Sequence, residues 1–216
     1  MMFARMLVPT LMMAGVLFGS AGHWDAWNVW AWLLAMYGVA ATTYTVLLKR
    51  SPELIKERIK PPSDGDTATR RLMVLPFLSH LVVAGLDLRF GWSAVPLPFV
   101  VAGLVLWTGG FLLVSWVLFS NPFASSAVRI QEERKQKVID SGPYAIVRHP
   151  MYLAVFIVCL GSGPALGSWW AALTMVPVLG IFVRRTRIED AMLQRELDGY
   201  VEYAKRVKWR VVPLVF

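Results

Sequence analysis

The chain has 216 residues, of which 56% are hydrophobic and 17% are charged, and its formal net charge is +8. An ordinary soluble domain of this size holds fewer apolar and more charged residues, so the composition indicates an integral membrane protein. The single cysteine, Cys159, excludes an intramolecular disulfide and a metal site built from paired cysteines.

Five apolar segments follow one another along the chain. They cover residues 3–20, 27–48, 72–88, 95–119 and 151–183. The first four are near the length of about 20 residues that crosses the hydrocarbon core of a bilayer. The fifth contains Gly161-Ser162-Gly163-Pro164, which interrupts a helix and predicts a hairpin of two short helices. The sequence therefore predicts an all-α, polytopic membrane bundle of five to six membrane segments.

The domain organisation follows from the same segments. We expect one integral membrane domain over residues 1–216, with N-terminal spans at 1–94 and a second part at 95–216. The stretch "PPSDGDTAT" at 61–69 is typical of a linker. The apolar start of the chain is similar to a secretory signal, but further long apolar segments follow, which favours a first membrane span.

Basic residues fall into three blocks. Of the 22 Lys and Arg residues, 7 lie in 49–71, 5 in 129–148 and 8 in 184–210. If the spans alternate in direction, all three blocks share one face, and the positive-inside rule makes that face cytoplasmic. We therefore expect both termini and the site in the cytoplasm, and the compact length of the chain favours the inner membrane of a bacterium. Such blocks attract anionic membrane lipids and do not indicate a nucleic-acid partner.

The stretch "SGPYAIVRHPMY" at 141–152 combines a turn with the start of a helix. Pro150 suits the first helical position, which makes His149 the N-cap residue. Free backbone N–H groups at such a helix start, together with Arg148, predict a receptor for a carboxylate or phosphate. The simpler interpretation is that Arg148 and His149 only reach toward the membrane interface.

Two tyrosines of this stretch, Tyr144 and Tyr152, add aromatic faces. A ring face attracts a cation within about 6 Å, and a ligand sulfonium is such a cation. The alternative is that Tyr152 belongs to an interfacial aromatic belt.

A second polar cluster lies at 184–213. Arg185 and Glu189 stand four residues apart on a predicted helix, where a simple i,i+4 ion pair is one interpretation. Glu189 and Asp190 also follow the last membrane helix on the same face as His149. A carboxylate and a cationic helix start can therefore converge on one polar pocket, which suits a bound amino acid.

Other polar and apolar residues are expected to serve packing. Leu193, Leu197 and Tyr200 follow at helical spacing and predict a helix that packs onto the membrane domain. His80 is expected to bond a neighbouring helix, and Asp87 lies at the end of a predicted span.

The order of these motifs carries a resemblance to a known family. "GPYAIVRHPMY" is followed about 35 residues later by "RTRIEDAML", then by "LDGYVEYAKRV" and "WRVVP". This pattern resembles the isoprenylcysteine carboxyl methyltransferase and phospholipid methyltransferase family of integral membrane enzymes. The resemblance covers roughly residues 95–216 and implies that this part is a catalytic core. The resemblance implies S-adenosyl-L-methionine as cofactor, in a pocket under cytoplasmic C-terminal helices, and a lipophilic or lipid-linked acceptor that arrives from the bilayer.

The resemblance also implies roles for individual residues. The implied cofactor-binding residues are Val138, Ile139, Tyr144, His149, Pro150, Met151, Tyr152 and Glu189, with Val138 and Ile139 in a strand-like stretch. Arg185 matches the arginine that orients the acceptor's carboxylate. Gln131 matches a family glutamine only across a short gap. Gln136 and Lys137 differ from the polar pair of the eukaryotic carboxyl methyltransferases, which leaves the acceptor open.

The implied reaction is a direct SN2 transfer of a methyl group to a carboxylate, thiol or amine. A carboxylate or thiolate needs orientation and desolvation rather than a base, whereas an amine requires deprotonation by Glu189 or a tyrosine. The acceptor path is expected beside 95–119 and 151–160. The alternatives are an NAD(P)H-dependent reductase of the sterol reductase type, for which the chain shows no Gly-rich phosphate motif, and a non-enzymatic membrane protein.

Overall fold

The computed structural model describes residues 2–60, 64–125 and 127–216, and within these ranges the regular structure is helical with no strand. The helices are α1 (Met2–Ala21), α2 (Trp27–Arg50), α3 (Pro52–Ile59), α4 (Asp64–Phe90), α5 (Leu97–Ser120), α6 (Pro150–Ala165), α7 (Trp169–Thr174), α8 (Val176–Glu196) and α9 (Tyr200–Arg206), with 3-10 turns η1 (Glu132–Arg134) and η2 (Gly142–Ala145).

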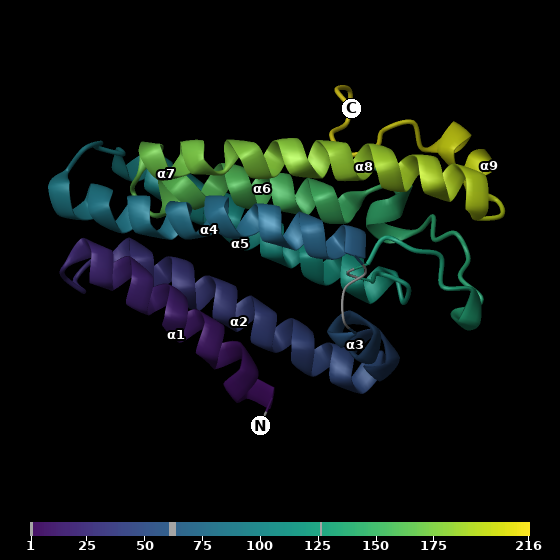
Figure 1. Cartoon of the computed structure of the whole chain (residues 1–216), viewed down its shortest axis with the longest axis horizontal. Helices are drawn as coiled ribbons and strands as arrows, with labels where there is room; N and C mark the ends of the chain where they lie inside the picture. The colour runs from purple at the N-terminus through teal and green to yellow at the C-terminus, as the bar shows by residue number, and fades with distance from the viewer. Residues whose placement is uncertain (1, 61–63, 126) are drawn as a thin grey trace.

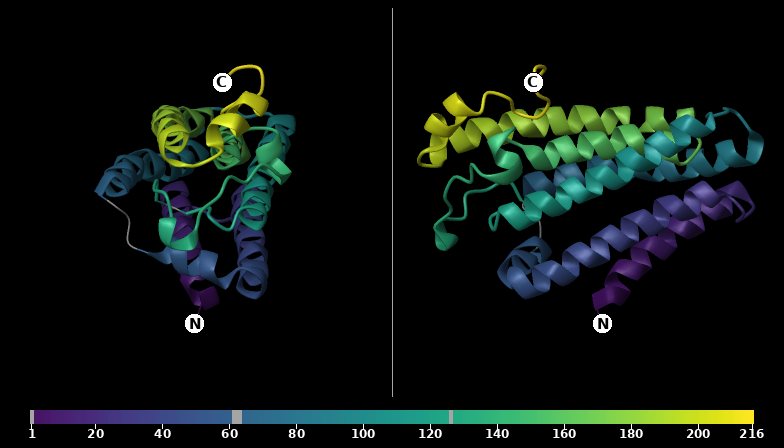
Figure 2. Two further views of the ribbon diagram at one scale, coloured as in Figure 1. Left: turned by 90° about the vertical axis from the view of Figure 1, so that its right-hand side faces the viewer. Right: turned by 180° about the vertical axis from the view of Figure 1, so that it is seen from behind.

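The long helices form a bundle of two parts (Figure 1). One part contains α4, α5, α6 and α8, and α1 with α2 lies against it, α1 on α4 and α2 on α5. The turns at 22–26, 91–96 and 166–168 lie at one end of the bundle. Helix α3, the segments 121–125 and 127–149, and α9 lie at the other end, as the view from behind in Figure 2 also shows.

Length and composition support the membrane prediction. Among the described residues, three helices are long and apolar enough to cross a bilayer: Trp27–Arg50, Thr67–Phe90 and Leu97–Ser120. Leu7–Ala21 and Pro150–Ala165 are shorter apolar helices. The all-α, polytopic bundle is therefore confirmed, while a sixth membrane segment stays a prediction.

Two helices run beyond their apolar segments. Helix α4 begins at Asp64, so residues 64–69 of the predicted linker are helical, and 61–63 lie outside the described residues. Helix α8 continues to Glu196, well past the predicted end of the span at 183. A helix needs only its backbone hydrogen bonds to continue, and apolar side chains decide what it contacts rather than where it ends.

The predicted break at Gly161 to Pro164 is misplaced, because α6 continues through it to Ala165. The glycines allow close packing instead: a Cβ on Gly161 would lie 2.7 Å from the backbone nitrogen of Trp107 in α5. The chain turns a few residues later, at Gly167, where φ is +77°. Glycine adopts this left-handed conformation without steric cost.

Buried polar groups fasten the helices together. The rings of Trp32 and Trp107 stack with centroids 4.3 Å apart, and Trp32 Nε1 donates to Oγ of Ser162 at 3.2 Å. His80 Nε2 lies 2.6 Å from the same Oγ, and its Nδ1 lies 2.9 Å from the carbonyl of Ala171. His80 therefore bonds neighbouring helices α6 and α7, as predicted.

Asp87, at the end of α4, also joins separate parts of the bundle by hydrogen bonds. Its carboxylate accepts the backbone N–H of Ser93 at 2.7 Å and the hydroxyls of Ser93 and Ser168. Ser168 in turn caps α7 by accepting the N–H of Ala171. These contacts fix the end of the bundle that lies opposite the basic blocks.

Candidate functional site

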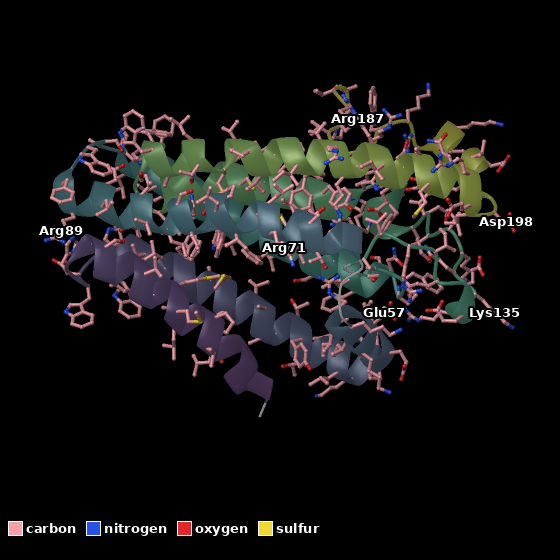
Figure 3. The ribbon with its side chains drawn as sticks, in the orientation of Figure 1. Glu57, Arg71, Arg89, Lys135, Arg187 and Asp198 are labelled. Atoms are coloured by element: carbon pink, nitrogen blue, oxygen red, sulfur yellow. The ribbon has the colours of Figure 1, made fainter. Side chains whose placement is uncertain are left out.

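A cavity of about 380 Å³ lies at the basic end of the bundle. It is lined by residues of 121–125 and 127–149, the start of α6, the later turns of α8, and α9. The predicted site residues that line it are Val138, Ile139, Tyr144, His149, Pro150, Met151, Tyr152, Arg185 and Glu189. Figure 3 shows Lys135 and Asp198 at this end and Arg89 at the opposite end. The fold thus brings all nine predicted residues around one cavity, and their roles stay predictions.

The turn before the Arg-His-Pro segment depends on a glycine. Gly142 has φ +59°, and a Cβ there would lie 2.7 Å from Oγ of Ser120. The turn sets Tyr144 in the cavity wall, where its hydroxyl accepts a hydrogen bond from Asn121 Nδ2 at 2.8 Å. Burial raises the pKa of Tyr144 to about 12 despite this hydrogen bond, so its phenol is neutral at physiological pH.

The C-terminal tail binds two backbone N–H groups that lie just before α6. The N–H of Arg148 donates to the carbonyl of Trp209 at 2.9 Å, and the N–H of His149 donates to the carbonyl of Arg210 at 2.8 Å. The Arg148 side chain also donates to the carbonyls of Val207 and Lys208. These two N–H groups therefore hold the tail, and the anion receptor that the sequence predicts at the start of α6 stays a prediction.

Asp190 is the centre of a buried polar network. Arg148 donates to both of its carboxylate oxygens, at 2.8 and 3.0 Å, and Arg210 donates to Oδ2 at 2.9 Å. Tyr200 donates its hydroxyl at 3.0 Å, and His149 Nε2 lies 3.1 Å from Oδ1. Burial opposes the ionisation of Asp190, but the donated hydrogen bonds outweigh it and hold the pKa of this carboxyl well below its usual range.

Glu189, the other member of the acidic pair, lines the cavity instead. Its side chain is 26% exposed and accepts a short hydrogen bond from the hydroxyl of Tyr152. That hydroxyl accepts from Nε of Arg185 at 3.0 Å, and the Tyr152 ring stacks on the ring of His149 at 5.7 Å. The cavity therefore presents a carboxylate, an aromatic face and a guanidinium within one small region.

Gln131, which matches a family glutamine only across a short gap, does not line the cavity. Gln131 is buried, and its side-chain Nε2 donates to the carbonyl of Phe123. Its backbone N–H donates to Oε1 of Gln136. Gln131 therefore stabilises the loop, whereas Gln136 and Lys137 line the cavity. Val138 and Ile139 lie in an irregular segment rather than a strand.

Sequence reasoning missed several lining residues. Tyr200 and Leu197 were expected only to pack, yet they line the cavity as well as joining a buried cluster with Tyr203. Asn121 and Arg58 also line it, and no sequence signal marks either of them. Arg58 comes from α3, far from the motifs in sequence, so only the tertiary fold brings it there.

The fold and this cavity define a polytopic helical membrane protein with a polar small-molecule cavity at its basic end. Residues 98–198 match the family model described as phospholipid methyltransferase. The family resemblance predicted from the sequence is confirmed over this segment, which includes most of the cavity wall. Residues 98–198 are thus similar to the phospholipid methyltransferase family.

Three curated relatives align with parts of the chain. The protein-S-isoprenylcysteine O-methyltransferase of Schizosaccharomyces pombe is 32% identical over 101 residues, which are 46% of this chain and 43% of the relative. The nickel-cobalt-cadmium resistance protein NccN of Alcaligenes xylosoxydans xylosoxydans is 27% identical over 85 residues (37% and 38%). The cobalt-zinc-cadmium resistance protein CzcN of Cupriavidus metallidurans is 27% identical over 135 residues (55% and 61%). The aligned parts therefore span between about two fifths and three fifths of these relatives.

Proposed function

We propose that the protein transfers a methyl group from S-adenosyl-L-methionine to a lipophilic or membrane-associated acceptor. The observation that carries this proposal is the convergence of nine residues, predicted from two separate regions of the chain, on one cavity at the end of a membrane bundle. These residues lie within the segment that matches the phospholipid methyltransferase family, a family that points to membrane methyltransferase activity.

The groups in the cavity fit this cofactor. The volume of about 380 Å³ falls within the range of roughly 300 to 1,000 Å³ for small-molecule sites. Glu189 can accept hydrogen bonds from ribose hydroxyls or an amino group, and Arg185 can donate to a carboxylate. Tyr152 offers an aromatic face to a sulfonium. Leu193 and Leu197 add an apolar wall.

When bound, S-adenosyl-L-methionine supplies an electrophilic methyl group on a sulfonium. The protein's part is to hold the acceptor in line with that group and to exclude water, which removes much of the entropic cost of the encounter. The cavity wall supports this role, since the neutral Tyr144 phenol can donate a hydrogen bond but is a poor base. Glu189 is left as the candidate base if the acceptor is an amine.

The orientation in the membrane belongs to the same proposal. The three basic blocks come from segments at the end of the bundle that contains the cavity (Figures 1 and 3). The positive-inside rule then supports a cytoplasmic site, reached by a water-soluble cofactor from one side and by a lipophilic acceptor from the bilayer. Location in a bacterial inner membrane stays a prediction from the sequence.

Calorimetric titration of the purified protein with S-adenosyl-L-methionine and S-adenosyl-L-homocysteine tests the proposal. We expect micromolar binding that His149→Ala and Glu189→Ala reduce at least tenfold. The matched controls are His23→Ala and Glu196→Ala, which change the same residue types at exposed positions outside the cavity and should bind normally. Absence of binding by the folded wild type would overturn the proposal and direct the same titration to NADPH.

A further inference from the structure

Four of the described tyrosines line the cavity at the basic end of the bundle, and they differ in where their hydroxyl protons go. Three donate to the protein itself: Tyr152 to Glu189, Tyr200 to Asp190 and Tyr203 to the backbone carbonyl of Tyr144. These three hydroxyl protons therefore stabilise the wall of the cavity and are not available to a bound molecule.

The hydroxyl of the fourth tyrosine, Tyr144, plays the opposite part. Its oxygen accepts a hydrogen bond from Nδ2 of Asn121 at 2.8 Å. A phenol hydroxyl carries one proton and can accept as well as donate, so accepting from Asn121 leaves that proton for another partner. Within the part of the chain that the structure describes, no atom accepts it.

Phe123 fixes the direction of the hydrogen bond between Asn121 and Tyr144. The Oδ1 atom of Asn121 accepts the backbone N–H of Phe123 at 2.8 Å. If the amide were turned over, its NH₂ group would face this N–H, and two donors would meet. The Nδ2 atom therefore faces Tyr144, and because an amide nitrogen only donates, Tyr144 can only accept from it.

The backbone holds Asn121 in this position. Asn121 is the residue that ends α5, and its N–H donates to the carbonyl of Val117 at 3.0 Å. Pro122 follows, and its ring fixes φ near −65° in the turn that Asn121 and Phe123 close. The side chain of Asn121 is thus set by the end of a helix and by a rigid turn.

The backbone of Tyr144 is held on both sides as well. Its N–H donates to the carbonyl of Ser141 at 3.2 Å, and its carbonyl accepts the hydroxyl of Tyr203 at 2.8 Å. The O–H bond of a phenol prefers the plane of the ring, because an oxygen lone pair conjugates with it. With Asn121 on one side of the oxygen, the proton takes the other in-plane direction.

We propose that Asn121 is a positioning residue for methyl transfer, which fixes Tyr144 as a hydrogen-bond donor to the bound cofactor. The inference rests on the proposed function and deepens it. Tyr144 then recognises a lone pair of the cofactor, on a carboxylate oxygen or a purine nitrogen, and disfavours an N–H or O–H group in the same place. Asn121 acts through Tyr144 and lies outside the motifs that carry the family resemblance.

The proton that this role requires is present at physiological pH. Burial raises the pKa of Tyr144 to about 12, and the negative charge of Glu189 acts in the same direction. The hydrogen bond from Asn121 and the positive charge of Arg58 oppose this increase without cancelling it. Tyr144 is therefore a neutral donor under the conditions in which a cofactor binds.

Asn121→Asp reverses the hydrogen bond at almost constant shape. The Oδ1 atom can still accept the N–H of Phe123, but an oxygen replaces Nδ2, so Tyr144 turns its proton toward residue 121 and presents a lone pair to the cofactor. We expect the affinity for S-adenosyl-L-homocysteine, measured by calorimetry on the detergent-purified protein, to fall about tenfold. By charge alone, the new carboxylate would strengthen binding of the cationic S-adenosyl-L-methionine, so weaker binding of both ligands reports the hydrogen bond.

Tyr144→Phe and a double variant separate positioning from a structural effect. Tyr144→Phe removes the donor and should lower the affinity for S-adenosyl-L-homocysteine about threefold to tenfold. In the Tyr144→Phe background, Asn121→Asp should change this affinity less than about twofold, because no hydroxyl is left to reverse. Tyr37→Phe, on α2 and outside the described wall of the cavity, is the matched control and should bind normally.

The Raman spectrum gives the role of the phenol directly. The intensity ratio of the tyrosine Fermi doublet is high for a phenol that only accepts a hydrogen bond and low for one that only donates. The spectrum of the wild type minus that of Tyr144→Phe isolates Tyr144. We expect a high ratio without ligand, a lower ratio with saturating S-adenosyl-L-homocysteine, and a low ratio for Asn121→Asp without ligand.

These outcomes separate the inference from the proposed function. Binding by the wild type with no change in the Raman ratio, or an equal loss from Asn121→Asp with and without the Tyr144 hydroxyl, would refute the positioning role and leave the methyltransferase proposal standing. No binding of either ligand by the folded wild type would overturn the proposed function, and the role of Asn121 with it. If Asn121→Asp does not fold, the wild-type spectra and Tyr144→Phe still decide the question.

Discussion

Arg148 and Asp190 form a buried ion pair in which Nε meets Oδ1 at 2.8 Å and Nη2 meets Oδ2 at 3.0 Å. Their side chains are 7% and 1% exposed. Glu189, the neighbour of Asp190 in sequence, lines the cavity instead. Asp190 thus stabilises the fold while Glu189 faces the cavity, because consecutive residues of a helix point in directions about 100° apart.

Asp190→Asn should destabilise the protein by about 3 to 5 kcal/mol, since it leaves the guanidinium of Arg148 buried without its carboxylate. The C-terminal tail should loosen as well, because Arg210 loses the same partner. Chemical unfolding of the detergent-purified protein, followed by circular dichroism, measures the loss.

Glu189→Gln is the matched control for this loss. The amide oxygen of glutamine can still accept the hydrogen bond of Tyr152, and the site stays partly exposed, so the free energy of unfolding should change by less than about 1 kcal/mol. An equal loss in the two variants would contradict the division between a structural and a cavity carboxylate.

Much of the candidate site could be predicted from the sequence because its residues are set by local rules. Pro150 fixes the start of α6, which places His149 and Tyr152 on the first turn. Arg185 and Glu189 stand one helical turn apart and share a face of α8. These local placements put the residues at one end of the bundle once the helices pack.

The contacts that could not be predicted join residues far apart in the chain. The pairing of Arg148 and His149 with Trp209 and Arg210 crosses about 60 residues and leaves no local pattern. Arg58 reaches the site only through the packing of α3. The break at Gly161 was misjudged for a related reason: whether a glycine breaks a helix or admits a neighbour depends on what packs against it.

Gly103→Ala should destabilise the pair of α5 and α6. A Cβ on Gly103 would lie 2.5 Å from the backbone nitrogen of Ala165 and 2.8 Å from the carbonyl oxygen of Gly161, and backbone atoms cannot move aside independently. Overpacking of this kind costs about 1 to 3 kcal/mol. The expected result is a lower midpoint of unfolding in detergent.

Gly109→Ala is the control on the same helix, because a Cβ there has no atom within 4 Å. Alanine also favours a helix over glycine by about 1 kcal/mol, so this variant should be as stable as the wild type or more stable. Equal destabilisation by the two changes would show that the close approach of α5 and α6 does not contribute to stability.

Tyr144 gives a prediction for alkaline pH. Its pKa of about 12 lies above the value of about 10 for an unfolded tyrosine, so the folded state holds the proton more tightly. The stability associated with the neutral buried phenol is therefore fully present below about pH 10 and is lost as the pH rises toward 12. Tyr144→Phe should remove this part of the pH dependence.

The measurement is the near-ultraviolet absorbance of tyrosinate in the wild type minus that in Tyr144→Phe, recorded across the alkaline range. We expect one ionisation step near pH 12. Asn121→Ala should move this step to higher pH, because the hydrogen bond from Asn121 favours the ionised form. A step near pH 10 would contradict the buried position of Tyr144 and would return this residue to the candidates for a general base.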